Sequence, residues 1–333
     1  MDIDRRHLLG LALAAGPLAV RAATAAATAG AGADVRAEGG FQPLWLAGLP
    51  EPVPAGLSEE IVERAAAGTA LRDRIARRVT RPGLTLVPAA KPDGSAVLII
   101  PGGAYQHVVI DKEGLEIADW LAARGTTAAV LRYRLPGDGW QSGPDAPLQD
   151  AQRALRLLRA SAAALRVDPT RIGVIGCSAG GHLAARLLTE GRTASYAARD
   201  AIDAASARAD FGALLYPVIA VGSVVYAHAV SSERLLGAQP DAARVARYTP
   251  SQHVSHDTPP TWLVHAGDDT AVPLQNTLDF HAALRANGVP TELHVYESGG
   301  HGFGLRFTVG KPVAAWPFAL RAWAVQHQFM NEA

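Results

Sequence analysis

Cysteine is almost absent from this chain of 333 residues, in which Cys177 is the only one. A single thiol cannot close an internal disulfide, so core packing has to supply the stability. An excess of charge of one sign is also missing, because 31 Lys and Arg balance 31 Asp and Glu. We therefore expect neither nucleic acid nor an anionic membrane surface as a partner, and a small neutral substrate fits better.

No apolar run is long enough to cross a bilayer. The longest candidate, residues 8–20, is too short, and it stands between Arg5-Arg6 and a stretch of small residues at 23–25. This order predicts an export signal over residues 1–25, and the letters DRRHLL resemble a twin-arginine signal. We expect a periplasmic or secreted protein without a stable membrane anchor.

Metal-binding spacing is missing as well. None of the 11 histidines belongs to a pattern such as H-E-x-x-H, so we expect no metal and no cofactor. The sequence gives no indication of an oligomeric state.

Strands and helices alternate along most of the chain. Continuous apolar runs such as 95–100 are typical of strands buried on both faces of a parallel sheet, and amphipathic stretches such as 147–165 predict the helices between them. We expect an α/β fold with a mostly parallel, doubly wound sheet covered by helices on both faces, after a linker and N-terminal arm at 26–70. Expected strands are 76–80, 84–88, 95–100, 126–133, 171–177, 211–216, 261–266 and 291–296; expected helices are 58–68, 112–124, 147–165, 178–188, 274–287 and 313–329.

The stretch RIGVIGCSAGGHLAARLL, residues 171–188, predicts a strand, a sharp turn and a helix around the pattern G-x-S-x-G. Gly176 and Gly180 flank Ser178 at the two positions where side chains would collide in such a turn. The turn would strain Ser178 and expose its hydroxyl beside the N–H groups of the first helical turn. The pattern predicts a nucleophile next to a site for negative charge; a glycine-rich turn without chemistry is the alternative. Cys177 is expected to be a small core residue.

Two later loops offer partners for the serine. Asp268 and Asp269 follow the expected strand 261–266, and His301 stands in the glycine-rich segment GGHGFG after the strand 291–296. Such an imidazole could take the proton of Ser178 and return it to a leaving group.

An oxyanion hole needs two or three N–H groups aimed at one oxygen. One candidate donor is Ala179, the residue after the nucleophile. The others are Gly103 and Ala104, because PGGA follows the strand 95–100 where many lipases and esterases carry H-G-G-G.

Several stretches together resemble a known group of proteins. These are IIPGGAYQHV, EGLEIADWLAARG with VLRYRLP, RIGVIGCSAGGHLAA, DTPPTWLVHAGDDTAVPLQN and ELHVYESGGHGFG. They resemble α/β-hydrolase serine esterases related to acetylxylan and other hemicellulose-trimming esterases. The resemblance to hormone-sensitive-lipase-like enzymes is more distant. The resemblance implies one α/β-hydrolase catalytic domain over residues 71–333. It also implies that Asp269, in the form D-x-x-V-P, is the acid of a triad with Ser178 and His301, with Asp268 as the fallback.

The resemblance further implies an exported serine carboxylic-ester hydrolase that removes short acyl groups, typically acetyl, from a small-molecule or oligosaccharide ester. The region 218–257 is modest and polar, without the long amphipathic helices of a lid that meets lipid. Four residues are expected on loops at the mouth of the site as substrate contacts: Tyr105, Arg134, Trp140 and His228. Trp140 could stack on a sugar ring, although packing on the surface is the more frequent role.

Two alternatives stay open. One is a serine peptidase or aminopeptidase of the same fold, which is disfavoured because no propeller is recognised before the hydrolase unit and no acidic pair stands ready to hold an amine. The other is a non-catalytic binding protein on a hydrolase scaffold, which is disfavoured because serine, acid and histidine occur in the expected order.

Overall fold

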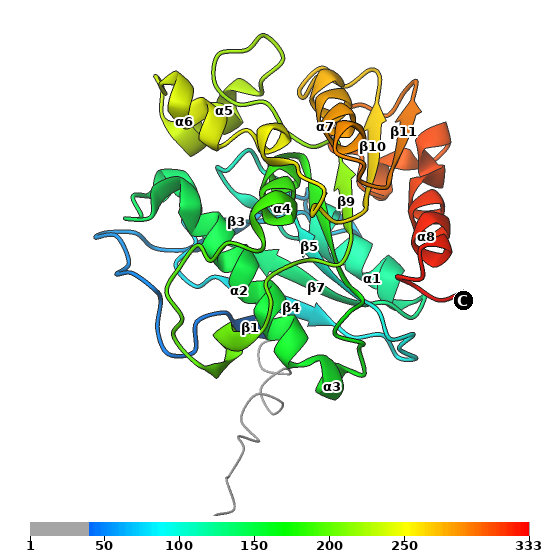
Figure 1. The fold of residues 1–333 in the computed structure, drawn as a ribbon, viewed down its shortest axis with the longest axis horizontal. Helices are drawn as coiled ribbons and strands as arrows, with labels where there is room; N and C mark the ends of the chain where they lie inside the picture. Colours follow the sequence, from blue (N-terminus) through cyan, green and yellow to red (C-terminus); the bar gives the residue numbers. More distant parts are fainter. Residues whose placement is uncertain (1–39, 333) are drawn as a thin grey trace, which may run out of the picture.

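The computed structural model describes residues 40–332, and its centre is an eight-stranded sheet (Figure 1). All neighbouring strands from β7 to β11 run parallel, whereas β1 and β4 add an antiparallel edge. The expected mostly parallel sheet is confirmed. In spatial order its strands are β1 (Phe41–Pro43), β4 (Gly83–Val87), β7 (Thr127–Arg132), β5 (Ala96–Ile100), β8 (Ile172–Cys177), β9 (Gly212–Leu215), β10 (Thr261–Ala266) and β11 (Thr291–Tyr296).

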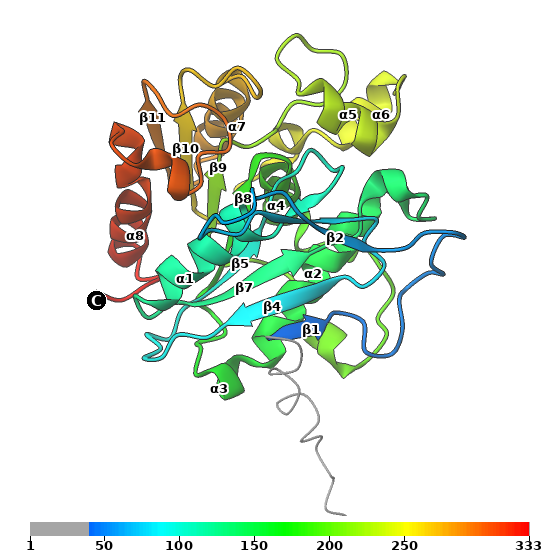
Figure 2. The ribbon, with the colours of Figure 1, turned by 180° about the vertical axis from the view of Figure 1, so that it is seen from behind.

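Two cores cover the two faces of this sheet. Along β5, Leu98 and Ile100 belong to one core and Val97 and Ile99 to the other, as the two-residue period of a strand requires. Helices α2, α4 and α7 fill the first core, and α1 and α8 fill the second. Figure 1 looks onto the side of α2 and Figure 2 shows the sheet from behind.

Most predicted helices are present with small shifts. The helices are α1 (Glu116–Ala122), α2 (Ala146–Ala160), α3 (Ala162–Leu165), α4 (Ser178–Glu190), α5 (Ala229–Leu236), α6 (Ala242–Arg247), α7 (Gln275–Ala286) and α8 (Trp316–Gln326). A π-helical turn, η1 (Asp111–Leu115), precedes α1. The 3₁₀ turns are η2 (Pro136–Asp138), η3 (Gly143–Asp145), η4 (Ala201–Ala204), η5 (Pro250–His253), η6 (Arg306–Thr308) and η7 (Pro312–Ala315). Within residues 40–332, no helix is both long and apolar enough to cross a membrane.

One predicted helix, 58–68, is wrong. Its residues form β2 (Glu60–Glu63), which pairs with β3 (Arg74–Arg77); β3 in turn pairs with β6 (Val108–Val109) in a second, three-stranded sheet. Ile61 and Val62 are β-branched and favour extended backbone, and pairing with the buried strand β3 outweighs the local helix signal.

The arm from residue 40 onward is tied into the domain by buried polar contacts. Trp45 donates its indole N–H to Asp150 of α2 at 2.7 Å, and the carbonyl of Leu44 accepts from Arg153 at 3.0 Å. This segment also supplies edge strand β1. Residues 1–39 lie outside the described residues, so the export signal at 1–25 stays a prediction.

Candidate active site

Ser178 lies where β8 ends and α4 begins. Its φ of 54° places a non-glycine residue in the left-handed region, which costs conformational energy. A Cβ on Gly176 would lie 2.6 Å from the carbonyl oxygen of Gly180, so the expected collision within the turn is real. A Cβ on Gly180 would instead lie 2.1 Å from the carbonyl oxygen of Ile100. This glycine therefore lets the elbow pack against the end of β5.

The structure brings Ser178, His301 and Asp269 together from the carboxyl ends of three parallel strands. Ser178 Oγ lies 2.8 Å from His301 Nε2, and His301 Nδ1 lies 2.7 Å from Asp269 Oδ2. A carboxylate can only accept, so Nδ1 carries the proton and Nε2 is free to accept from the serine hydroxyl. The Asp269 side chain is fully buried, whereas that of His301 is about a quarter exposed.

Asp269 is held as a charged, oriented acceptor. Its Oδ1 accepts from the N–H groups of Ala271 and Val272 at 3.0 and 2.9 Å. Burial opposes its ionisation, but hydrogen bonds from His265 and His301 outweigh that effect and hold the pKa of Asp269 well below its usual range. The carboxylate is thus ready to stabilise a positive imidazole.

His265 was not among the predicted site residues. Its buried ring lies behind Asp269, with Nε2 2.9 Å from the carbonyl oxygen of Val272 and 3.2 Å from Asp269 Oδ2. Since Nε2 faces two acceptors, it carries the proton, and Nδ1 accepts from the hydroxyl of Thr277 at 2.6 Å. A signal was available in the sequence, because a histidine at the end of a buried strand stands four residues before the acid.

Asp268, the fallback acid, has another partner. Its Oδ1 accepts from the N–H groups of Gly299 and Gly300 at 2.8 and 2.7 Å, and these bonds lower the pKa of its carboxyl. Asp268 thereby fixes the start of the loop that carries His301. The geometry brings Asp269, not Asp268, to the imidazole.

The loop after β5 passes directly against Ser178. A Cβ on Gly102 would lie only 2.8 Å from the Cβ of Ser178. Gly103, Ala104 and Tyr105 follow with φ of 129°, 56° and 57°, so three successive residues have positive φ and the chain turns sharply. We call residues 101–105 the oxyanion loop.

Three backbone N–H groups border the serine without an internal partner. Within residues 40–332, no hydrogen-bond acceptor is found for the N–H groups of Gly103, Ala104 and Ala179. The N–H of Gly102 is unavailable, because it donates to Glu113 at 2.9 Å. The N–H groups predicted for an oxyanion hole are thus the ones left free near Ser178.

Three hydrogen bonds hold the oxyanion loop, which starts with Pro101 where the H-G-G-G motif of many lipases and esterases has a histidine. We call these the loop anchors: Tyr133 Oη to the carbonyl of Pro101 at 2.9 Å, Gly102 N–H to Glu113 at 2.9 Å, and Tyr105 Oη to His182 Nδ1 at 2.8 Å. His182 Nε2 lies 2.8 Å from the carbonyl oxygen of Tyr248 and must donate there, so Nδ1 accepts from Tyr105. Burial lowers the pKa of His182 to about 3, which keeps it neutral.

Three of the four predicted substrate contacts are wrong, because their side chains are buried. Tyr105 is used as a loop anchor. Arg134 is 0% exposed and pairs with Asp150 at 3.0 Å and with Glu51 of the arm at 2.6 Å. Trp140 is also buried, with the guanidinium of Arg134 5.2 Å from its ring. Glu51 of the arm thus holds the loop after β7 at Arg134 and at the N–H of Ser142.

His228 is the predicted contact that stays near the site. It is partly exposed and begins α5, where its Nδ1 lies 2.7 Å from the hydroxyl of Ser231. Burial and the neighbouring His301 lower its pKa.

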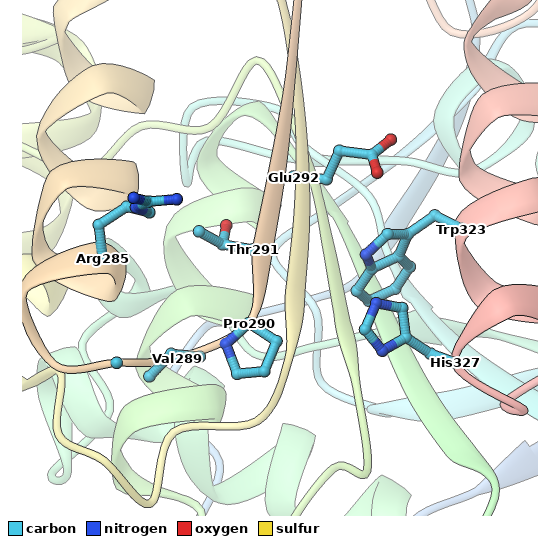
Figure 3. Close-up of a pocket in the computed structure, with 8 residues that line it drawn as sticks. Arg285, Val289, Pro290, Thr291, Glu292, Trp323 and His327 are labelled. Atoms are coloured by element: carbon cyan, nitrogen blue, oxygen red, sulfur yellow. The ribbon is translucent and has the colours of Figure 1, made fainter.

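A surface pocket of about 490 Å³ lies away from this centre. Figure 3 shows it at the amino end of β11, between α7 and α8, with Arg285, Pro290 and Trp323 among its lining residues. Because parallel strands place their carboxyl ends together, this pocket is at the opposite end of the strand from the loop of His301. Within residues 40–332, no group of three His, Cys, Asp or Glu side chains is arranged to hold a metal.

Comparison with known proteins places the chain in a family. The family described as BD-FAE matches residues 84–284, more than half of the chain. An acetylxylan esterase of Xylanibacter ruminicola is 34% identical over 218 residues, which cover 64% of this chain and 42% of that protein. Endo-1,4-beta-xylanase B of Butyrivibrio fibrisolvens is 33% identical over 208 residues, which cover 62% of this chain and 32% of that protein.

The chain thus spans less than half the length of these curated relatives. A solved structure, an acetyl ester-xyloside bifunctional hydrolase from Caldicellulosiruptor lactoaceticus, superposes with a TM-score of 0.72 at 33% identity and covers 88% of this chain and 98% of that one. From the extent of these matches, together with the parallel sheet and its strand-to-helix elbow, we conclude that this chain is an α/β-hydrolase that belongs to the BD-FAE family.

Proposed function

We propose that this protein is a serine carboxylic-ester hydrolase that removes short acyl groups, acetyl foremost, from carbohydrate. The observation that carries the proposal is the continuous chain from Ser178 Oγ through the His301 ring to the buried Asp269 carboxylate, with contacts of 2.8 and 2.7 Å. A hydroxyl, a correctly protonated imidazole and an ionised acceptor in this order are what acyl transfer requires.

The first half of the proposed reaction forms an acyl-enzyme. Ser178 Oγ attacks the ester carbonyl while His301 Nε2 takes the hydroxyl proton, and Asp269 stabilises the resulting imidazolium. The carbonyl oxygen becomes negative and is bound by the N–H groups of Gly103, Ala104 and Ala179. The carbon–oxygen bond to the alcohol then breaks, and His301 gives its proton to the departing sugar oxygen.

The second half releases the acid. A water molecule gives one proton to His301 and attacks the acyl carbon, the same N–H groups bind the new oxyanion, and the bond to Ser178 Oγ breaks as that oxygen regains the proton. Cys177 is not a rival nucleophile, since burial and the nearby Glu113 raise the pKa of its thiol well above its usual value.

Two observations support a short acyl group on carbohydrate. The region over the site contains only the short helices α5 and α6, of 8 and 6 residues, so it offers no long apolar lid for a lipid tail. The relatives at 34% and 33% identity are named an acetylxylan esterase and a xylanase.

The test is hydrolysis of p-nitrophenyl acetate, butyrate and octanoate by the full chain. We expect the acetate to react with the highest kcat/KM and Ser178→Ala to lose almost all activity, whereas Ser206→Ala, a matched change at an exposed serine, keeps it. Equal rates for wild type and Ser178→Ala would refute the nucleophile and favour a non-catalytic protein. Faster cleavage of acyl p-nitroanilides than of esters would favour the peptidase alternative.

The carbohydrate part of the proposal needs its own measurement. Acetate release from acetylated xylo-oligosaccharides should depend on Ser178, and its absence alongside good model-ester activity would assign the enzyme to another natural ester.

Export is a further part of the proposal, supported by the order of charges, apolar residues and small residues in the first 25 positions. We expect the protein in the periplasmic or secreted fraction, and replacing Arg5 and Arg6 together by Lys should retain it inside the cell if the twin-arginine route is used.

A further inference from the structure

One buried carboxylate, that of Glu113, touches the oxyanion loop from behind. Glu113 lies on the π-helical turn η1 and is 3% exposed. Its Oε2 accepts from the N–H of Gly102 at 2.9 Å, and its Oε1 accepts from the hydroxyl of Tyr216 at 3.2 Å. Both donors are neutral, and no ion pair of Glu113 is found within residues 40–332.

Tyr216 extends this contact to the loop of His301. It directly follows β9, is fully buried, and its hydroxyl accepts from the N–H of Gly304 at 3.2 Å. Because a carboxylate oxygen can only accept, the hydroxyl proton of Tyr216 points to Glu113. The ring of Tyr216 also stands edge-on to the imidazole of His301, with ring centres 5.1 Å apart.

The oxyanion loop and the loop of His301 both approach Glu113 closely. A Cβ on Gly102 would lie 2.7 Å from Glu113 Oε2 and 2.8 Å from the Cβ of Ser178. A Cβ on Gly302 would lie 3.3 Å from Glu113 Oε1. The nucleophile elbow, the oxyanion loop and the histidine loop therefore meet at one carboxylate.

A carboxylate in this place is costly for folding. Taking it out of water carries a desolvation penalty that neutral donors offset only in part, and an apolar side chain of similar size would avoid it. In return, a hydrogen bond to a charged acceptor is roughly twice as strong as a neutral one. The N–H of Gly102 is thereby fixed directly before the free N–H groups of Gly103 and Ala104.

We propose that Glu113, acting together with Tyr216, is a positioning residue that holds the oxyanion loop and the histidine loop in register around Ser178. This inference rests on the proposed esterase function. Glu113 does not touch the substrate; it acts through Gly102 on the oxyanion donors and through Tyr216 and Gly304 on the imidazole. Its contribution is therefore to the transition state, in which the oxyanion and the imidazolium both form.

The decisive variant is Glu113→Gln, which keeps the shape but places an amide NH₂ against one of two donors. We expect kcat for p-nitrophenyl acetate to fall by about 10- to 100-fold, the size of effect that a displacement of about 1 Å produces, while KM changes less than about threefold because ground-state binding is untouched. Tyr216→Phe removes the hydroxyl that joins Glu113 to Gly304 but leaves the bond between Glu113 and Gly102 in place, so it should lower kcat by a smaller factor. The double variant should lose less than the product of the two single losses, since both act through one connection.

A purely structural role predicts a different result, and titration of the reactive serine separates the two. Diethyl p-nitrophenyl phosphate releases one p-nitrophenolate for each Ser178 that it phosphorylates, so the burst counts competent sites. A structural role would reduce the burst and leave kcat per titrated site unchanged, which would overturn the inference. If Glu113→Gln does not fold, kcat per titrated site of Tyr216→Phe decides in the same way.

Matched controls are Glu190→Gln, a carboxylate bound to Arg186, and Tyr196→Phe, a tyrosine bound to Asp203. Both should retain the wild-type kcat per titrated site. Failure of the proposed function is distinguishable, because wild type would then show no hydrolysis that depends on Ser178. Wild-type activity with unchanged kcat per site in Glu113→Gln and Tyr216→Phe refutes the positioning role alone.

Discussion

Replacing Tyr105 by Phe tests whether the hydrogen bond to His182 holds the oxyanion loop. The change removes one oxygen atom from a fully buried side chain and leaves Nδ1 of the equally buried His182 without its donor. No other residue within 40–332 donates to this nitrogen. The perturbation is small in volume, so its effect reports on the hydrogen bond.

The size of the effect follows from two costs. A buried acceptor that loses its donor costs about 1–3 kcal/mol. Ala104 and Tyr105 both have left-handed backbone, which costs a non-glycine residue roughly 1–2 kcal/mol, so a freed loop gains by relaxing. We expect the free energy of unfolding to fall by about 1–3 kcal/mol, and kcat to fall about tenfold or more as the N–H groups of Gly103 and Ala104 leave the oxyanion.

Urea unfolding and steady-state hydrolysis of p-nitrophenyl acetate measure the two effects side by side. Tyr196→Phe is the matched control, because it removes a hydrogen bond to Asp203 on the α2 side of the fold and should lower stability without lowering kcat. A Tyr105→Phe enzyme with reduced stability and wild-type kcat would show that the other loop anchors suffice. Unchanged stability as well as kcat would refute the reasoning altogether.

Three further predictions concern the acid, the elbow and the pH response. Asp269→Asn should lower kcat by roughly 10³-fold or more, because an amide cannot fix the imidazole tautomer, whereas Asp268→Asn keeps an accepting oxygen for its loop; the opposite ranking in steady-state kinetics would exchange their roles. Gly180→Ala should destabilise the chain by about 3 kcal/mol or more, since the added carbon would overlap a carbonyl oxygen of β5, and a soluble variant with native urea stability would contradict the steric argument. Burial lowers the pKa of His182 to about 3 in the folded chain, so as the pH falls the unfolded chain protonates this histidine before the folded chain does. The free energy of unfolding should therefore decline below a pH of about 6.5, by up to about 1.4 kcal/mol per pH unit. His182→Gln should flatten this slope in urea unfolding between pH 6 and 5, and an unchanged slope would assign it to other groups.

The parallel part of the fold could be predicted from the sequence because its central strands β5, β8 and β10 are buried along their whole length. For β10 and β11 the predicted and observed bounds coincide at 261–266 and 291–296, since each run of strand-forming residues is bounded by turn residues. The segment 58–68 failed for the opposite reason. It is mostly exposed, its own pattern is weak, and its strand forms through pairing with a partner that no local signal reveals.

The same distinction applies to the site. A catalytic motif fixes the spacing of its residues along the chain. The order of serine, acid and histidine, and the choice of Asp269, could therefore be predicted from the sequence. The buried Glu113 acts through contacts between distant segments, and an isolated Glu in the sequence does not indicate them. Arg134 was misassigned because the loop after a strand faces the site only if nothing covers it, and here Glu51, 83 positions earlier, does.

The loop anchors explain how this chain can do without a histidine at the start of its oxyanion loop. They come from the residue directly after β7, from η1 before α1, and from α4, and α1 and α4 pack on opposite faces of the sheet. The anchors bind Pro101, Gly102 and Tyr105, which are three different residues of the loop. Ala104, with its positive φ, therefore lies between anchored residues on both its N-terminal and its C-terminal side. Through these anchors the positions of the oxyanion donors depend on both cores at once. The geometry of the catalytic centre is therefore a property of the packed sheet as a whole, and the elbow at Ser178 is one of several segments that the sheet holds in place.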